Sequence, residues 1–149
     1  MSKIKIVYGT VGGNTELVCE RAAEVLEKKG HVVELLKVRG TDPEKMGEYD
    51  LLILACPTYG IGELEDFFEI FLQKLEAVDL KGRKCAIIAL GDPKYDKDYH
   101  LESAKIIMDF LKKKEAKVLH MPLRISKSPL PLIKEGFVDR WAEKVAELL

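Results

Sequence analysis

The sequence predicts a three-layer α/β/α fold, in which helices cover both faces of a doubly wound, five-stranded parallel sheet. Strand-like apolar segments alternate along the chain with segments of helical periodicity, and this alternation is typical of parallel sheets. Residues 51–56 are apolar throughout, which indicates a strand that is buried on both faces. Residues 9–13 hold three glycines directly after the first strand, which is typical of a tight strand-to-helix turn.

The same patterns place each element in turn. The helix that begins at residue 15 is expected to stop at Gly30, because glycine is a common helix C-terminal residue. A helical turn is expected at 43–46, inside a turn-rich connection. The expected strands are 3–8, 32–38, 50–56, 84–90 and 117–125, the last one broken near Pro122, and the expected helices are 15–29, 64–75, 104–111 and 137–148.

Composition bounds the class of protein. The chain has 149 residues, of which 47% are apolar and 33% are charged, as in soluble globular proteins. No repeat or linker divides the chain, so residues 1–149 are expected to form a single domain. The longest apolar run, 51–56, is too short to span a membrane, and the start of the chain does not resemble a secretory signal. We therefore expect a cytoplasmic protein.

The cysteines and histidines give no sign of a metal site. Three cysteines are present without a Cys-x-x-Cys pair, at Cys19, Cys56 and Cys85. This spacing argues against a disulfide framework or a structural zinc site and fits a reducing compartment. The histidines are scattered, so no metal is expected.

Three connections are expected at one edge of the sheet. In doubly wound sheets, ligands bind at the carboxyl ends of the strands, where the strand order reverses. The connections that follow the first, third and fourth strands are 9–14, 57–63 and 91–99. Any binding site should be built from these three segments.

The first connection has the residue types that bind a phosphate through neutral donors. It carries hydroxyls, an amide and glycines but no lysine or arginine: Gly9, Thr10, Val11, Gly12, Gly13, Asn14 and Thr15. Hydrogen bonds to a charged group contribute about 1.5–3 kcal/mol each. After association costs, such a loop alone gives about micromolar affinity at best, so a tight ligand also needs an apolar part. The alternative is a plain strand-to-helix turn in which Thr15 caps the helix.

The other two connections supply aromatic side chains. The second contains Pro57, Thr58, Tyr59, Gly60, Ile61 and Gly62, and the third follows Leu90 with Gly91, Asp92, Tyr95 and Tyr99. Aromatic residues on two loops that flank one crevice favour a sandwich around a planar ring. The alternative is an ordinary glycine turn with a surface tyrosine. A phosphate site beside a stacked ring predicts a mononucleotide-like cofactor.

These segments resemble the signature of flavodoxins. The matching stretches are 6–15, 56–60, 62–64, 90–92 with Tyr95, and 123–125 with Trp141. They span the chain in the right order, and the chain has no room for the insertion that divides the fifth strand of long-chain flavodoxins, so it resembles the short-chain type. The resemblance implies strand order 2-1-3-4-5 and non-covalent FMN between strands one and three, a rule for which flavodoxins are themselves a standard example.

The resemblance also implies a role for individual residues. Thr10, Asn14 and Thr15, with the N–H groups of their loop, would hold the FMN phosphate. Tyr59 would lie on the inner face of the flavin and Tyr95 on the outer face.

Two further roles concern the backbone. The Gly60–Ile61 peptide matches the one that flips to accept a hydrogen bond from N5–H of the neutral semiquinone. The backbone at Asp92 matches the segment that reads the pyrimidine edge of the ring.

Charge is divided between the two edges of the expected sheet. The edge beside the flavin would be acidic, with Glu63, Glu65, Asp66, Glu69, Glu76, Asp79, Asp92, Asp96, Asp98 and Glu102. The opposite edge would be basic, with Lys3, Lys5, Lys28, Lys29, Lys81, Arg83, Lys84, Lys112, Lys113, Lys114 and Lys117. An acidic rim would steer basic redox partner proteins to the flavin. The alternative is two solvated faces with lysines at helix C-termini. The basic residues have no interleaved aromatics, so nucleic acid is not an expected partner.

The function implied is that of a monomeric, low-potential, one-electron carrier between redox partner proteins. Such a protein has no substrate of its own, so no catalytic residues are expected. One alternative is a flavodoxin-like, FMN-dependent NAD(P)H or quinone reductase. A signalling receiver domain is a second alternative, but Tyr8-Gly9-Thr10 and Cys56 stand where its acidic residues should be.

Overall fold

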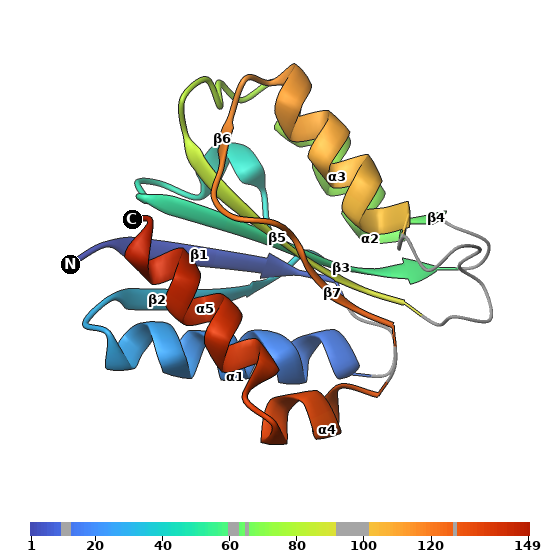
Figure 1. The fold of residues 1–149 in the computed structure, drawn as a ribbon. Helices are drawn as coiled ribbons and strands as arrows, with labels where there is room; N and C mark the ends of the chain where they lie inside the picture. The colour runs from blue at the N-terminus through green and yellow to red at the C-terminus, as the bar shows by residue number, and fades with distance from the viewer. Residues whose placement is uncertain (10–12, 60–62, 65, 92–101, 127) are drawn as a thin grey trace.

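The structure is a computed structural model that describes residues 1–9, 13–59, 63–64, 66–91, 102–126 and 128–149. Its centre is a parallel sheet with helices on both faces (Figure 1). The strands lie in the order β2-β1-β3-β5-β6, and β7 also pairs with β5. This arrangement confirms the order 2-1-3-4-5, with two short strands in the fifth position. The parallel strands are β1 (Lys3–Tyr8), β2 (Val32–Lys37), β3 (Leu51–Tyr59), β5 (Lys84–Leu90), β6 (Lys117–Val118) and β7 (Leu123–Ile125).

The fifth strand is broken where the sequence predicts. β6 pairs with the beginning of β5 at Lys84 and Cys85, whereas β7 pairs with its end at Ile88–Leu90. His120, between the two, has a φ of 61°, which few residues other than glycine adopt. Pro122 lacks an N–H to donate to a sheet. The Leu119 N–H still donates to the Cys85 carbonyl of β5 at 2.8 Å. The chain therefore leaves the sheet at 120–122 and re-enters it at Leu123.

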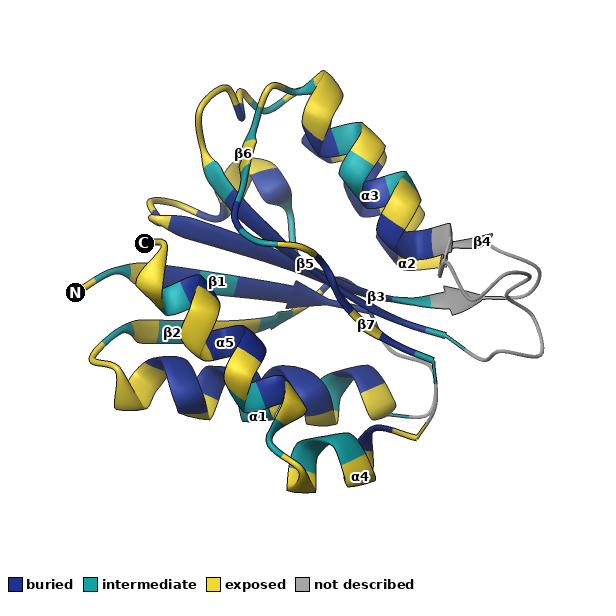
Figure 2. Cartoon of the chain, in the orientation of Figure 1, coloured by how far each residue is buried: buried dark blue, intermediate teal, exposed yellow. Residues whose placement is uncertain are grey.

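The apolar pattern of the strands divides the core into two halves. Ile4 and Ile6 of β1 pack on one face of the sheet against α1 (Asn14–Lys28) and α5 (Phe137–Glu147). Leu52 and Leu54 of β3 pack on the other face against α2 (Asp66–Leu75) and α3 (Glu102–Lys113). Figure 2 shows the central strands buried along most of their length. The prediction that residues 51–56 are covered on both faces is confirmed.

The helices follow their predicted faces. Val18, Ala22, Val25 and Leu26 of α1 are all buried. The expected helical turn at 43–46 is the 3₁₀ helix η1 (Pro43–Lys45), in which the Asp42 carboxylate accepts a hydrogen bond from the Glu44 N–H. These apolar stripes fix each helix against the sheet, because burial of apolar surface dominates the energetics of packing.

One helix is absent from the sequence prediction. α4 (Pro129–Lys134) contains two prolines, which favour a break in a helix interior. Here Pro129 and Pro131 lie in the first turn, where N–H groups have no intrahelical acceptor and proline is tolerated. Gly136, with a φ of 80°, then separates α4 from α5.

The second connection is shorter than expected. The sequence predicts a loop over 57–63, but β3 continues through Tyr59 and pairs antiparallel with β4 (Glu63–Leu64). Thr58 and Tyr59 favour extended backbone, and strand pairing outweighs the glycine-rich pattern that suggests an early turn. The predicted loop boundary is therefore wrong by three residues at its start.

Candidate functional site

The three predicted connections begin at neighbouring strand ends. Tyr8 at the end of β1 lies opposite Ala55 in β3, and Pro57 lies opposite Leu90 at the end of β5. β2 and β3 flank β1 on its two sides, so the chain leaves β1 at a point where the strand order reverses. Such a switch point is where open parallel sheets bind their ligands.

The first connection brings a helix N-terminus to this edge. The Gly9 N–H donates to the Ala55 carbonyl at 3.0 Å, which ties the start of the connection to β3. Gly13 has a φ of 87° and precedes the first residue of α1, Asn14. N–H groups in the first turn have no acceptor within the helix, and the helix dipole favours an anion there.

Thr15 is the clearest ligand candidate on the described part of this segment. It is 1% exposed, and its hydroxyl has no hydrogen-bond partner among the described residues. A buried hydroxyl without a partner costs about 1–3 kcal/mol, so this group fits a ligand-binding role. The alternative, Thr15 as the helix cap, is wrong because Gly13 occupies the N-cap position.

The last residues before the second and third connections are anchored within the sheet. Pro57 is half-buried and Leu90 is buried, and the Gly91 N–H donates to the Ile125 carbonyl at 3.0 Å. The hydroxyl of Ser103 in α3, which is fully buried, donates to the Cys56 carbonyl at 3.4 Å. Sequence reasoning missed this contact, whose only local signal is a small polar residue on the buried face of a helix.

Several predicted site residues lie outside the described part of the chain. Their positions and roles stay predictions, as do the side-chain roles of Thr58 and Tyr59. They are Thr10, Val11, Gly12, Gly60, Ile61, Gly62, Asp92, Tyr95 and Tyr99.

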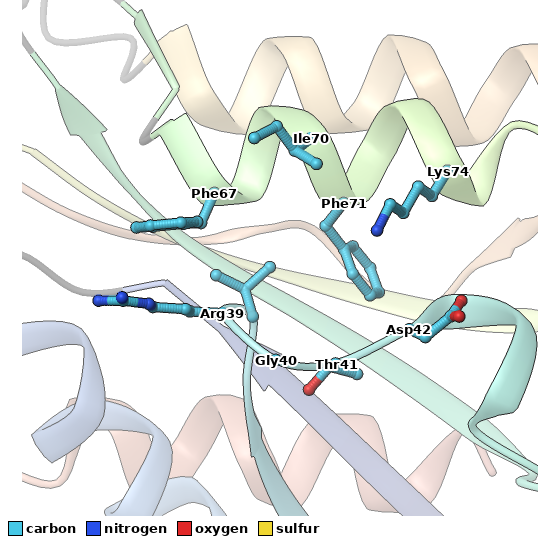
Figure 3. Close-up of a pocket in the computed structure, with 9 residues that line it drawn as sticks. Arg39, Gly40, Thr41, Asp42, Phe67, Ile70, Phe71 and Lys74 are labelled. Atoms are coloured by element: carbon cyan, nitrogen blue, oxygen red, sulfur yellow. The ribbon is translucent and has the colours of Figure 1, made fainter.

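A cation that sequence reasoning missed lies at the same edge. The Val38 N–H donates to the Tyr8 carbonyl at 2.8 Å, so Arg39 follows directly beside the end of β1. Its guanidinium carbon lies 4.9 Å from the centre of the Phe67 ring in α2 (Figure 3). The two side chains line a pocket of about 390 Å³, between the segment after β2 and α2. Arg39, in the segment directly after β2, thus brings a cation to the edge of the sheet at which β1 ends.

The described charges correct part of the predicted acidic rim. Asp66 and Glu69 are exposed in the first half of α2, next to the end of β4. Glu76 and Asp79 follow the other end of that helix, where the Lys114 Nζ donates to the Glu76 carbonyl at 2.6 Å. These two acids therefore lie among the basic residues of the opposite edge, because α2 runs antiparallel to the strands.

Tyr8, at the end of β1, is buried. Burial raises the pKa of its phenol, and the negative charge of Glu16 in α1 raises that pKa further.

The described residues contain no group of three or more acidic, histidine or cysteine side chains that could hold a metal ion. No helix in the described ranges is long and apolar enough to cross a membrane.

The fold and site define a doubly wound α/β protein with a helix N-terminus at its switch point. Residues 6–141 match the family model described as flavodoxin. The flavodoxin of Maridesulfovibrio salexigens is 37% identical over 99% of both chains. The flavodoxin of Synechocystis is 36% identical over 95 residues, which are 62% of this chain and 54% of that protein.

Solved structures agree with the sequence comparisons. Oxidised flavodoxin 2 from Bacillus cereus is 31% identical, with a TM-score of 0.90 over 99% of both chains. A Fusobacterium nucleatum flavodoxin bound to flavin mononucleotide has the same fold, with a TM-score of 0.82 over 100% of this chain and 99% of that one at 20% identity.

The chain belongs to the flavodoxin family. This membership confirms the resemblance noted in the sequence and supports an FMN-based electron carrier. It disfavours the receiver domain and the reductase as alternatives.

Proposed function

We propose that this protein is a one-electron carrier that holds FMN non-covalently at the carboxyl edge of its sheet. The observation that carries the proposal is the buried Thr15 hydroxyl at the N-terminus of α1, the helix that follows β1. Thr15 and the N–H groups of the first helical turn would bind the phosphate, together with Thr10 and Asn14. Neutral donors hold the phosphate without cancelling its charge.

The isoalloxazine ring would lie between the second and third connections. Tyr59 and Tyr95 would cover its two faces and exclude water. The backbone at Asp92 would hold the pyrimidine edge of the ring. The carbonyl of the Gly60–Ile61 peptide would accept a hydrogen bond from the flavin N5–H. Pro57, Leu90 and Gly91 are the described residues that fix where these segments begin.

When bound, FMN supplies the capacity to accept and release electrons one at a time. The protein's part is to hold the ring at the surface beside exposed acids, which disfavour further negative charge on it. This environment favours a low potential for the second reduction step.

The partners are proposed to be basic redox proteins. Asp66 and Glu69 are exposed at the beginning of α2, next to the exposed side chains of Phe67 and Ile70. Acids of this kind steer a basic partner, and exposed apolar groups give it a contact surface. We further propose that residues 1–149 act as a single domain, and that the protein is a cytoplasmic monomer without a substrate of its own.

An anaerobic reductive titration tests the proposal. The protein is loaded with FMN and reduced stepwise, while the absorption spectrum is followed. We expect stoichiometric flavin binding and two separate one-electron steps. Failure to bind FMN would refute the proposal.

Steady-state turnover tests the reductase alternative. FMN-loaded protein is mixed with NADH or NADPH, with and without a quinone. Rapid turnover without a partner protein would establish an enzyme instead of a carrier.

A further inference from the structure

We propose that the pocket between α5 and the break in the fifth strand binds a small amphiphilic anion, with an apolar body and one carboxylate. The pocket has a volume of about 360 Å³, which is within the range of small-ligand sites. It lies between residues 120–124 and one face of α5, on the side of the sheet that α1 and α5 cover (Figure 1). It shares no lining residue with the proposed flavin site.

The inner surface of the pocket is apolar. Trp141 is 5% exposed, and its indole Nε1–H donates to the Met121 carbonyl at 2.9 Å. This hydrogen bond removes the polar edge of the ring from the pocket and leaves its carbon atoms as lining. Met121 and Phe137 add exposed apolar side chains at 65% and 38% exposure. Because removing apolar surface from water is favourable, an apolar group of a ligand would displace water from this lining.

The rim of the pocket is basic. Of the nine residues that line it, Arg124, Arg140 and Lys144 carry positive charges and none is acidic. An Arg140 nitrogen donates to the neutral carbonyl of Glu135 at 3.1 Å. The charge of Arg140 also acts on the Asp139 carboxylate, but Arg140 forms no ion pair within 4.0 Å among the described residues. Lys144 lies 3.4 Å from Glu147 in an ion pair whose side chains are 52% and 67% exposed, and such pairs contribute little. Both cations therefore remain available to an anion.

The geometry of α5 explains why the two kinds of side chain meet. Phe137, Arg140, Trp141 and Lys144 are spaced by three, one and three positions, which places them on one side of a helix. Only the tryptophan is needed for the core, where it packs against the sheet. The other three form a surface whose apolar and cationic parts complement an anionic amphiphile. A cationic or neutral ligand would satisfy only the apolar part.

The single tryptophan of the chain, Trp141, allows a direct test. FMN-loaded protein is titrated with sodium octanoate below its micellar range, and the indole N–H resonance is followed by NMR. We expect a saturable shift of that resonance, with octanoate bound roughly tenfold more tightly than octyltrimethylammonium or 1-octanol. No saturable shift, or equal binding of the three probes, would overturn the proposal.

Three variants test whether octanoate binds in this pocket. Met121 is exposed, so Met121→Glu leaves the fold intact and places an acid in the pocket; octanoate binding should be lost. The double change Arg140→Gln with Lys144→Gln should weaken octanoate roughly tenfold. Lys112→Gln with Lys113→Gln removes the same charge from exposed positions of α3 and should leave binding unchanged. Equal weakening by both double variants would overturn the proposal, as would release of FMN by octanoate.

Discussion

Arg21 of α1 and Asp139 of α5 form a two-bond ion pair that links the two helices on one face of the sheet. The Arg21 Nε lies 2.7 Å from one carboxylate oxygen of Asp139, and Nη2 lies 2.6 Å from the other. Their side chains are 30% and 25% exposed, so water screens this pair less than a fully exposed one. The pair lowers the pKa of Asp139 below its ordinary value of 3.8, chiefly through the hydrogen bonds from Arg21.

Removing this charge should cost stability at neutral pH. Asp139→Asn keeps the shape but loses the charge, and we expect the free energy of unfolding to fall by about 1–2 kcal/mol at pH 7. A carboxyl group whose pKa is lowered by folding stabilises the folded state at pH values above its pKa in the unfolded chain. This contribution is lost as the pH falls through the pKa of the folded state. The difference in unfolding free energy between the parent protein and Asp139→Asn, measured by urea unfolding, should therefore shrink below about pH 4.

Glu147→Gln is the matched control for this pair. It removes the exposed ion pair of Lys144 and Glu147, whose atoms are 3.4 Å apart. The change in unfolding free energy should stay within about 0.5 kcal/mol. A similar loss in both variants would mean that the two-bond geometry has no special effect.

Thr15→Val should separate the ligand role of the hydroxyl from its structural role. Valine has the same shape, and the hydroxyl has no partner among the described residues, so the apoprotein should keep its stability or gain up to about 1 kcal/mol. FMN affinity should fall roughly tenfold, because a charged hydrogen bond is lost. Riboflavin, which lacks the phosphate, should bind as before. Flavin fluorescence titrations measure both affinities.

Ser103→Ala provides the contrast for this substitution. Its hydroxyl is also buried, but it donates to the Cys56 carbonyl. This variant should lose about 1 kcal/mol of stability with no selective effect on FMN. If Thr15→Val behaves in the same way, the Thr15 hydroxyl is only structural.

Gly13→Ala should weaken FMN binding through the backbone. Gly13 has a φ of 87°, and no described atom lies within 4 Å of where a Cβ would be, so the cost arises from the positive φ and not from a clash. We expect a loss of about 1 kcal/mol in stability and a roughly tenfold loss in FMN affinity as the loop shifts.

Gly82→Ala is the control for backbone strain. Gly82 has a φ of 73° with similarly open surroundings, but it precedes β5 at the opposite edge of the sheet. It should lose similar stability and keep its FMN affinity. Equal losses of affinity would show that Gly13 acts only through global stability.

The two ends of α2 offer a test of electrostatic steering. Asp66→Asn with Glu69→Gln should slow electron transfer from the reduced protein to a basic cytochrome c roughly threefold at low salt. Glu76→Gln with Asp79→Asn removes the same charge from the far end and should change the rate little. Stopped-flow rates over a range of ionic strength measure both. If both double variants respond alike, net charge controls the rate and the rim does not.

Local sequence patterns are sufficient to predict the strands and most of the helices. The apolar faces of residues 18–26 and 51–56 require burial on defined sides, and the alternation of elements then fixes a parallel sheet. That topology also places the strand ends that precede the three connections at one edge of the sheet. The position of Gly13 at the N-cap, in place of Thr15, depends on backbone angles that local composition does not determine.

The features missed by sequence reasoning depend on contacts between distant segments. Arg39 and Phe67 are far apart in the chain, and no local pattern announces that the segment after β2 meets α2. Glu76 is close to the rim acids in the sequence but not in space, because α2 runs from one end of the strands to the other. α4 was missed because its prolines are tolerated only in a first turn.

The burial of all three cysteines has a practical consequence for electrochemistry. Cys19, Cys56 and Cys85 are buried and form no disulfide, and burial raises the pKa of the Cys85 thiol to about 12. Thiols of this kind react slowly in a folded protein, so one introduced surface cysteine would be the sole anchor to a gold electrode. A protein anchored through Lys113→Cys would have the proposed flavin edge turned toward the solution, whereas one anchored through Asp66→Cys would have that edge turned toward the gold. The ratio of the electrode currents of the two variants would show how electron transfer depends on orientation.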